Sequence, residues 1–106
     1  MAKIKVPFVF FDNESAAKIS DNDLFVNGNE DLVVTMEGSG EIVIEGLADM
    51  NAEEWHTLAL INKSDFTVHE VLTTSGIYSC SVNGFYKIRA NAIAISEPLS
   101  LYVNLV

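Results

Sequence analysis

The side chains with the most capacity for chemistry are acidic, and many of them lie between residues 21 and 31. Asp21, Asp23, Asn27, Glu30 and Asp31 together offer enough oxygen atoms to bind Ca²⁺, which takes six to eight. Their spacing does not match an EF-hand loop, and such residues more often form a solvated loop with Asx turns. We therefore expect no metal or other cofactor. The five residues remain weak calcium candidates, because a solvated acidic loop is the favoured interpretation.

Residues that could catalyse a reaction by other means stand apart from one another. His56 and His69 have no cysteine or further histidine nearby, whereas a zinc site usually needs three or four such ligands. Cys80 alternates with Tyr78 and Val82, which is typical of a packed, unreactive thiol. The chain has no P-loop, no GxGxxG and no Gly-x-Ser-x-Gly elbow. We therefore expect that the protein is not an enzyme.

One pair of carboxylates flanks a glycine-rich segment. If Gly38-Ser39-Gly40 forms a turn, Glu37 and Glu41 are expected to face each other across it. Two carboxylates at the right separation can hydrolyse a glycosidic bond. A pair beside a hairpin tip is more often surface charge, so we assign these two residues no catalytic role.

Four other side chains are candidates for contact with a partner. Trp55 and Tyr102, with Tyr86, are aromatic residues on which a sugar could stack, although aromatic residues on strands more often pack in a core. Lys87 and Arg89 are conspicuous because the chain has so few cations. We expect Arg89 to pair with a carboxylate, in the same chain or, less often, in a neighbouring copy.

Composition limits the classes of partner. The 106 residues include 15 acidic and 6 basic side chains, for a net charge of −9, so nucleic acid is excluded as a partner. The apolar run Val6–Phe11 is too short to span a membrane and lacks the features of a signal peptide. A single cysteine rules out a disulfide within the chain. We expect a soluble chain that is made in the cytoplasm and binds no membrane.

The elements that must position these residues are strands. Apolar residues alternate with polar ones in short segments separated by turn residues, a period of two that indicates half-buried strands. Asn83-Gly84 predicts a tight hairpin between two such segments. The stretch 12–31 is the least regular and is expected to hold loops and short edge strands. We predict an all-β fold: one antiparallel, jelly-roll-like β-sandwich of about eight or nine strands, spanning residues 1–106.

The segment Asn51–Asn62 admits two interpretations. Asn51 followed by Glu54 has the pattern of a helix start, with Asn51 as N-cap. One helical face would then carry Trp55, Leu58, Ala59 and Asn62. Alternatively, a strand runs from about Glu54 to Asn62. The strand is favoured because the neighbouring elements are β, and the helix stays open.

The order of motifs from Gly38 to Val106 resembles the small β-sandwich virion proteins of tailed bacteriophages and prophages. The resemblance rests on the strand Glu41–Gly46, on Gly76-Ile77-Tyr78, and on Val82-Asn83-Gly84-Phe85-Tyr86-Lys87-Ile88-Arg89-Ala90. It covers about two thirds of the chain and carries over no catalytic residue.

The resemblance implies a structural protein of the head, tail or baseplate, made in the bacterial cytoplasm and located in the virion. Its partners would be other copies of itself and other phage structural proteins, with Val6–Phe11 and Leu99–Val106 as candidate contact strands. Carbohydrate-binding modules have similar sandwiches. A host glycan bound at Trp55, with or without calcium, is therefore the alternative.

Overall fold

The computed structural model describes residues 7–26 and 30–106, and this part of the chain is built from strands and loops. It contains no helix, and so none of a length and apolarity that could cross a membrane. The nine strands are β1 (Phe8–Glu14), β2 (Lys18–Ile19), β3 (Leu24–Phe25), β4 (Asp31–Leu47), β5 (His56–Thr57), β6 (Leu60–Asn62), β7 (Val68–His69), β8 (Gly76–Ser81) and β9 (Lys87–Leu105).

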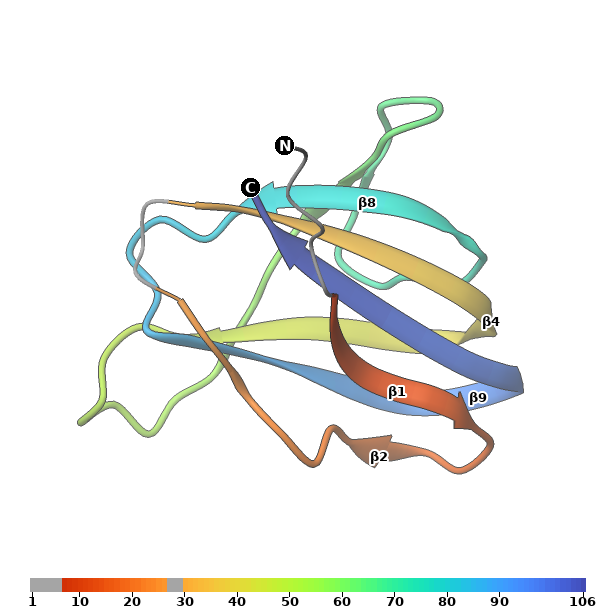
Figure 1. The fold of residues 1–106 in the computed structure, drawn as a ribbon, viewed down its shortest axis with the longest axis horizontal. Coiled ribbons are helices and arrows are strands. Elements are labelled where there is room, and N and C mark those ends of the chain that lie inside the picture. Colours follow the sequence, from red (N-terminus) through yellow and green to blue (C-terminus); the bar gives the residue numbers. More distant parts are fainter. Residues whose placement is uncertain (1–6, 27–29) are drawn as a thin grey trace, which may run out of the picture.

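Two long strands run through the whole fold. β4 has 17 residues and β9 has 19, and they pair antiparallel from Leu32 opposite Leu105 to Leu47 opposite Lys87. The register shifts several times between Glu37 and Ile42, where both strands bend. Each strand therefore contributes one half to each of two layers, and the layers face each other in Figure 1.

We call these layers 1 and 2. Layer 1 contains residues 31–37 of β4 and 99–105 of β9, extended by β1 on one side and by β8, β6 and β7 on the other. Layer 2 contains residues 41–47 of β4 and 87–95 of β9, extended by the short strands β2 and β3 at one edge and β5 at the other. The sheet is hydrogen-bonded continuously and folds over on itself.

The bend depends on glycine. Gly38 has φ of 112°, a conformation that side chains disfavour, and a Cβ there would lie 2.3 Å from the carbonyl oxygen of Pro98. A Cβ on Gly40 would lie 2.2 Å from the carbonyl oxygen of Ala94. The backbones of β4 and β9 can therefore approach closely where the sheet turns over.

This bend corrects one expectation. Gly38-Ser39-Gly40 does not reverse the chain, because β4 continues through it with β9 as its partner on both sides. Glu37 pairs with Ser100 in layer 1 and Glu41 pairs with Ala94 in layer 2, so the two carboxylates do not face each other across a turn. The proposed carboxylate pair is not formed.

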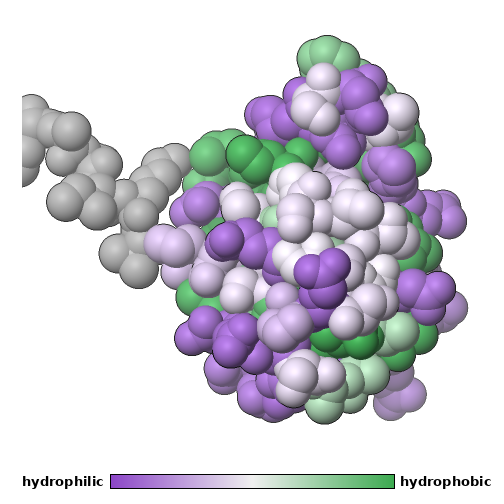
Figure 2. Space-filling model, turned by 90° about the vertical axis from the view of Figure 1, so that its right-hand side faces the viewer, coloured by the Kyte–Doolittle hydropathy of each residue, from purple (hydrophilic) through white to green (hydrophobic). Residues whose placement is uncertain are grey.

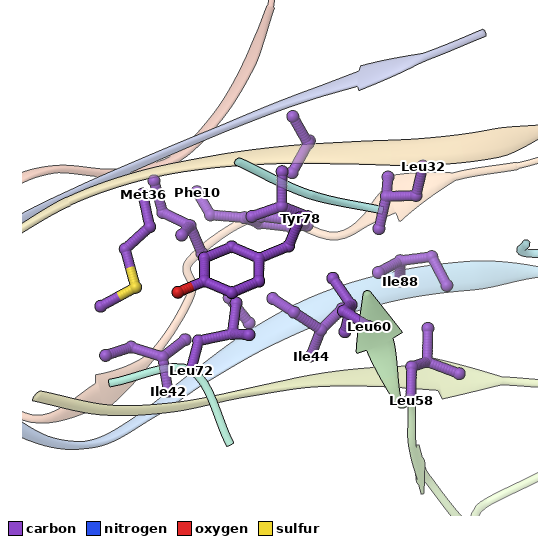
Figure 3. Close-up of a cluster of buried hydrophobic side chains, with 14 of the residues drawn as sticks. Phe10, Leu32, Met36, Ile42, Ile44, Leu58, Leu60, Leu72, Tyr78 and Ile88 are labelled. Atoms are coloured by element: carbon purple, nitrogen blue, oxygen red, sulfur yellow. The ribbon is translucent and has the colours of Figure 1, made fainter. Parts of the chain in front are cut away.

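The core lies between the layers. Alternate residues of β4, β8 and β9 point inward, and Figure 3 shows Tyr78 surrounded by aliphatic side chains from both layers. The Tyr78 hydroxyl donates a hydrogen bond of 2.8 Å to the carbonyl oxygen of Thr74, which satisfies its one polar atom. Leu58, Leu60 and Leu72 close the side where the chain crosses between the layers.

The predicted fold class is confirmed: the chain is an all-β sandwich, and the described residues form nine strands. The segment Asn51–Asn62 holds β5 and all of β6 rather than a helix. Asn83 and Gly84 do form a turn, with φ of 89° at Gly84, but no hairpin follows. The expected hairpin is wrong because β8 pairs with β4 and β6 in layer 1, while β9 starts in layer 2.

Candidate functional site

Three of the four interaction candidates meet on the outer face of layer 2. Arg89 on β9 lies directly opposite Glu45 on β4, and its Nε donates a hydrogen bond of 2.8 Å to Glu45 Oε1. The two side chains are only 21% and 15% exposed. The expected carboxylate partner of Arg89 is therefore confirmed, and it lies in the same chain.

Trp55 lies under both cations. The guanidinium carbon of Arg89 is 4.1 Å from the centroid of the indole ring, and Lys87 Nζ is 5.5 Å from it. Contacts of this kind are worth about 0.5–1 kcal/mol at exposed sites and more where water is excluded. They hold the loop that carries Trp55 against the sheet.

Aromatic and acidic side chains continue this surface toward β3. Lys87 forms an ion pair of 3.1 Å with Asp23 and lies 5.9 Å from the ring of Phe25. Phe25 and Tyr86 contact edge to face at 5.4 Å between centroids. We call this set the tryptophan cluster: Asp23, Phe25, Glu45, Trp55, Tyr86, Lys87 and Arg89. Because each of its cations has a carboxylate partner within the cluster, its charges are balanced locally.

The fourth candidate, Tyr102, lies on the outer face of layer 1. It stands in a row of cross-strand neighbours from β1 to β8, and a second row extends from β9 to β7. We call these outward residues the neutral face: Val9, Tyr102, Thr35 and Ile77 in the first row, and Asn104, Val33, Ser79, Ile61 and Val68 in the second. The structure does not bring Tyr102 together with the tryptophan cluster.

The neutral face is uncharged, and more than half of its residues are aliphatic. Four of its aliphatic side chains, Val9, Ile61, Ile77 and Val68, are between 40% and 65% exposed. Among the described residues of this layer's strands, charged side chains stand at its borders, with Asp31 and Glu37 at the two ends of this half of β4 and Lys63 beyond Ile77. A surface of this kind can bind another protein by excluding water from apolar side chains.

A loop beside the neutral face presents an aromatic residue to solvent. The connection from β6 to β7 projects from the body in Figure 1, and in Figure 2 the top of the molecule shows a small hydrophobic area at its tip among mostly hydrophilic side chains. Phe66 in this loop is 78% exposed and has φ of 62°, which is strained for a bulky residue. Asp65 fixes the loop by accepting hydrogen bonds from both the backbone amide and the hydroxyl of Thr67.

The calcium candidates are dispersed. Asp21 pairs with Lys18 at 3.0 Å, a contact that raises the pKa of Lys18, and Asp23 pairs with Lys87. Asp31 lies within β4, opposite Ser81, and Asn27 falls outside the described residues. Over residues 7–26 and 30–106, no three acidic, histidine or cysteine side chains are grouped as metal ligands.

The candidate catalytic residues lie in ordinary structural settings. Burial raises the pKa of the Cys80 thiol to about 11, with a smaller contribution from the negative charge of Asp31. At neutral pH this thiol is protonated, so it is a poor nucleophile. His69 Nε2 lies 2.6 Å from the hydroxyl of Thr67, and the ring packs edge to face on Tyr78. His56 is exposed on β5.

Sequence reasoning missed two parts of these surfaces. Phe25 lies in the stretch that the sequence marks as irregular and acidic, yet in β3 it stands directly opposite Lys87. The outward positions of the neutral face were also overlooked. The sequence does indicate them, because the outward positions of these strands carry no charge. These positions are Val33, Thr35, Ile77 and Ser79.

The fold can be compared with solved structures. The chain matches the crystal structure of SPBc2 prophage-derived protein YomS with a TM-score of 0.74 and 22% sequence identity, over 100% of both chains. A scan against protein-family profiles finds no match, and a search of curated proteins finds none. The match covers the part before Gly38 as well, which the sequence resemblance did not. This chain thus has the fold of a prophage-derived protein.

Proposed function

We propose that the chain is a non-enzymatic structural protein of a bacteriophage or prophage particle, which acts by self-assembly and by docking to other particle proteins. The observation that carries this proposal is the neutral face. Exposed aliphatic side chains in adjacent rows, without charge, are typical of a surface that another protein covers. The fold shared with a prophage-derived protein over the full length supports the phage origin.

Placement of charge supports assembly over catalysis. A chain of net charge −9 keeps its copies apart in solution, which helps to keep them soluble before they assemble. The charged side chains at the centre of the tryptophan cluster are paired with one another and so serve to hold the sandwich together. The protonated thiol of Cys80 fits the same role, because it packs in the sandwich.

The proposed location is the virion, after synthesis in the bacterial cytoplasm. The test is to induce a lysogen that carries the gene, purify the particles on a density gradient, and measure the chain by quantitative mass spectrometry. We expect a fixed number of copies per particle, in a ratio to the major capsid or tail protein that stays constant between preparations. A chain that is abundant in the lysate and absent from purified particles would contradict the proposal. If the chain is present in the particles, separate purification of heads and tails assigns it to one part of the particle.

A carbohydrate-binding module is the second candidate. Trp55, Tyr86 and the largely exposed Phe25 lie together on one face, with polar side chains around them, as a sugar site requires. However, Arg89 already covers one face of the Trp55 ring. Binding on a glycan array that is lost in both Phe25→Ala and Trp55→Ala, and retained in Ile77→Ala on the other layer, would favour this function.

A further inference from the structure

The neutral face has the features of a contact between identical chains. We infer that two copies of the protein associate through it, face to face, around a two-fold axis that runs parallel to the strands. This inference deepens the self-assembly part of the proposed function and rests on it. It names both the surface and its occupant, which is a second copy of this chain.

Charge is the reason for choosing a second copy as the occupant. Two chains of net charge −9 repel, and they can approach closely only where neither presents carboxylates. The nine residues of the neutral face carry no charge, whereas layer 2 presents the exposed carboxylate of Glu41 beside the paired charges of the tryptophan cluster. A basic partner would gain nothing on an uncharged surface and would be drawn to the acidic parts of the chain instead.

Charge also selects the orientation of the two copies. Asp31 and Glu37 lie at opposite ends of the same half-strand of β4. An axis across the strands would place Asp31 of one copy over Glu37 of the other. An axis along the strands, between β4 and β8, avoids this clash, because it lays β4 of one copy over β8 of the other.

In that orientation the facing positions are complementary. Asp31 then lies over Ser81 of the second copy, and Thr35 lies over Ile77. The border cation Lys63, whose backbone amide bonds to the carbonyl oxygen of Ile77, approaches Tyr102 of the second copy, where a cation–π contact is available. Every apolar side chain at the centre meets an uncharged side chain.

The area of the neutral face limits how tightly two copies can associate. Six strands about 4.8 Å apart and two rows of outward residues give roughly 300–400 Å² per copy. A stable complex buries about 800 Å² per partner. Because the face is smaller than a standard interface, we expect a weak, reversible dimer that forms at protein concentrations between about 10 μM and 1 mM, and that many neighbouring copies in a particle would reinforce.

Two matched variants test this contact. Ile77 on the neutral face is 48% exposed, and Ile93 on the layer 2 half of β9 is 54% exposed. Ile77→Arg and Ile93→Arg make the same change in charge and size, at equally exposed strand positions on opposite faces. Sedimentation velocity of the full chain and both variants, from about 1 μM to 1 mM, measures the association directly. Thermal unfolding confirms that both variants fold.

We expect the full chain and Ile93→Arg to dimerise with the same dissociation constant, and Ile77→Arg to dimerise at least tenfold more weakly. A chain that stays monomeric at 1 mM would overturn the inference, as would an Ile77→Arg variant that dimerises like the unaltered protein. A monomer that is nevertheless found in purified particles would leave the proposed function standing. A dimer through this face in a protein absent from particles would support the contact and contradict the particle role.

Discussion

On the outer face of layer 2, β9 presents Lys87 and Arg89, and each of them is paired with a carboxylate and packed on Trp55. On the outer face of layer 1, the same strand presents the uncharged side chains of Tyr102 and Asn104, and no ion pair covers them within residues 7–26 and 30–106. The two faces share their long strands, their pleat and their core. They differ in whether the outward side chains satisfy one another within the chain.

The outward side chains of layer 2 are thus satisfied by contacts within the chain, whereas those of the neutral face are left available for contact with a partner. The tryptophan cluster stabilises the monomer, because its ion pairs and ring contacts tie β3 and the Trp55 loop to the sheet. The neutral face adds little to the stability of one chain, since its side chains remain in contact with water. Substitutions in the tryptophan cluster should therefore change folding, while substitutions in the neutral face should change association.

The largest loss of stability is expected at the bend where β4 and β9 pass from one layer to the other. Gly38→Ala should lower the free energy of unfolding by about 3 kcal/mol or more, because its Cβ meets the Pro98 backbone and its φ is positive. Gly84→Ala is the matched control. It also has a positive φ but open space around it, so its loss should be about 1 kcal/mol. Urea unfolding measures both, and equal losses would contradict the role of the close approach.

The next largest effect is expected on the alkylation rate of the Cys80 thiol, which packs between the two layers. Because burial raises the pKa of Cys80 to about 11 from 9.0, its thiolate fraction at pH 8 should be about a hundredfold lower than that of a free thiol. Alkylation by iodoacetamide should be slow in the folded chain and reach the free-thiol rate in urea. Fast alkylation of the folded protein at pH 8 would show that this region opens.

A smaller effect is expected in the tryptophan cluster. Arg89→Ala should destabilise the monomer by about 1–2 kcal/mol, because it leaves the shielded Glu45 carboxylate without a partner and uncovers Trp55. Arg89→Lys should recover part of this loss. Trp55 fluorescence and thermal unfolding measure the effect, and the dimer dissociation constant should stay unchanged. A loss of dimerisation would instead assign the contact to layer 2.

The smallest effect is expected at the loop beside the neutral face. Phe66→Gly should leave the stability unchanged or raise it by up to about 1 kcal/mol, because glycine tolerates the positive φ. Phe66→Ala retains the strained backbone and should be no more stable than the unaltered chain. Urea unfolding compares them. A clear loss of stability in Phe66→Gly would show that the ring supports the fold.

Most of the fold could be predicted from alternation, because inward positions such as Leu32, Val34 and Tyr78 follow a period of two. The bend could not, since a Gly-Ser-Gly segment is compatible with both a turn and a continued strand, and only the pairing with β9 decides between them. The ion pair of Arg89 was predictable from the scarcity of cations. Its identity, Glu45, was not, because cross-strand register depends on the bulges at the bend.

Hydroxyl-radical footprinting, below and above the concentration at which the chain dimerises, measures which of the two faces becomes protected from solvent. We expect oxidation of Val9, Ile77 and Tyr102 to fall as the concentration rises, while oxidation of Phe25, Trp55 and Ile93 stays constant. The assignment of the neutral face as the contact between copies would be contradicted by protection of Phe25 and Trp55 instead. It would also be contradicted if no side chain became protected at concentrations where the dimer forms.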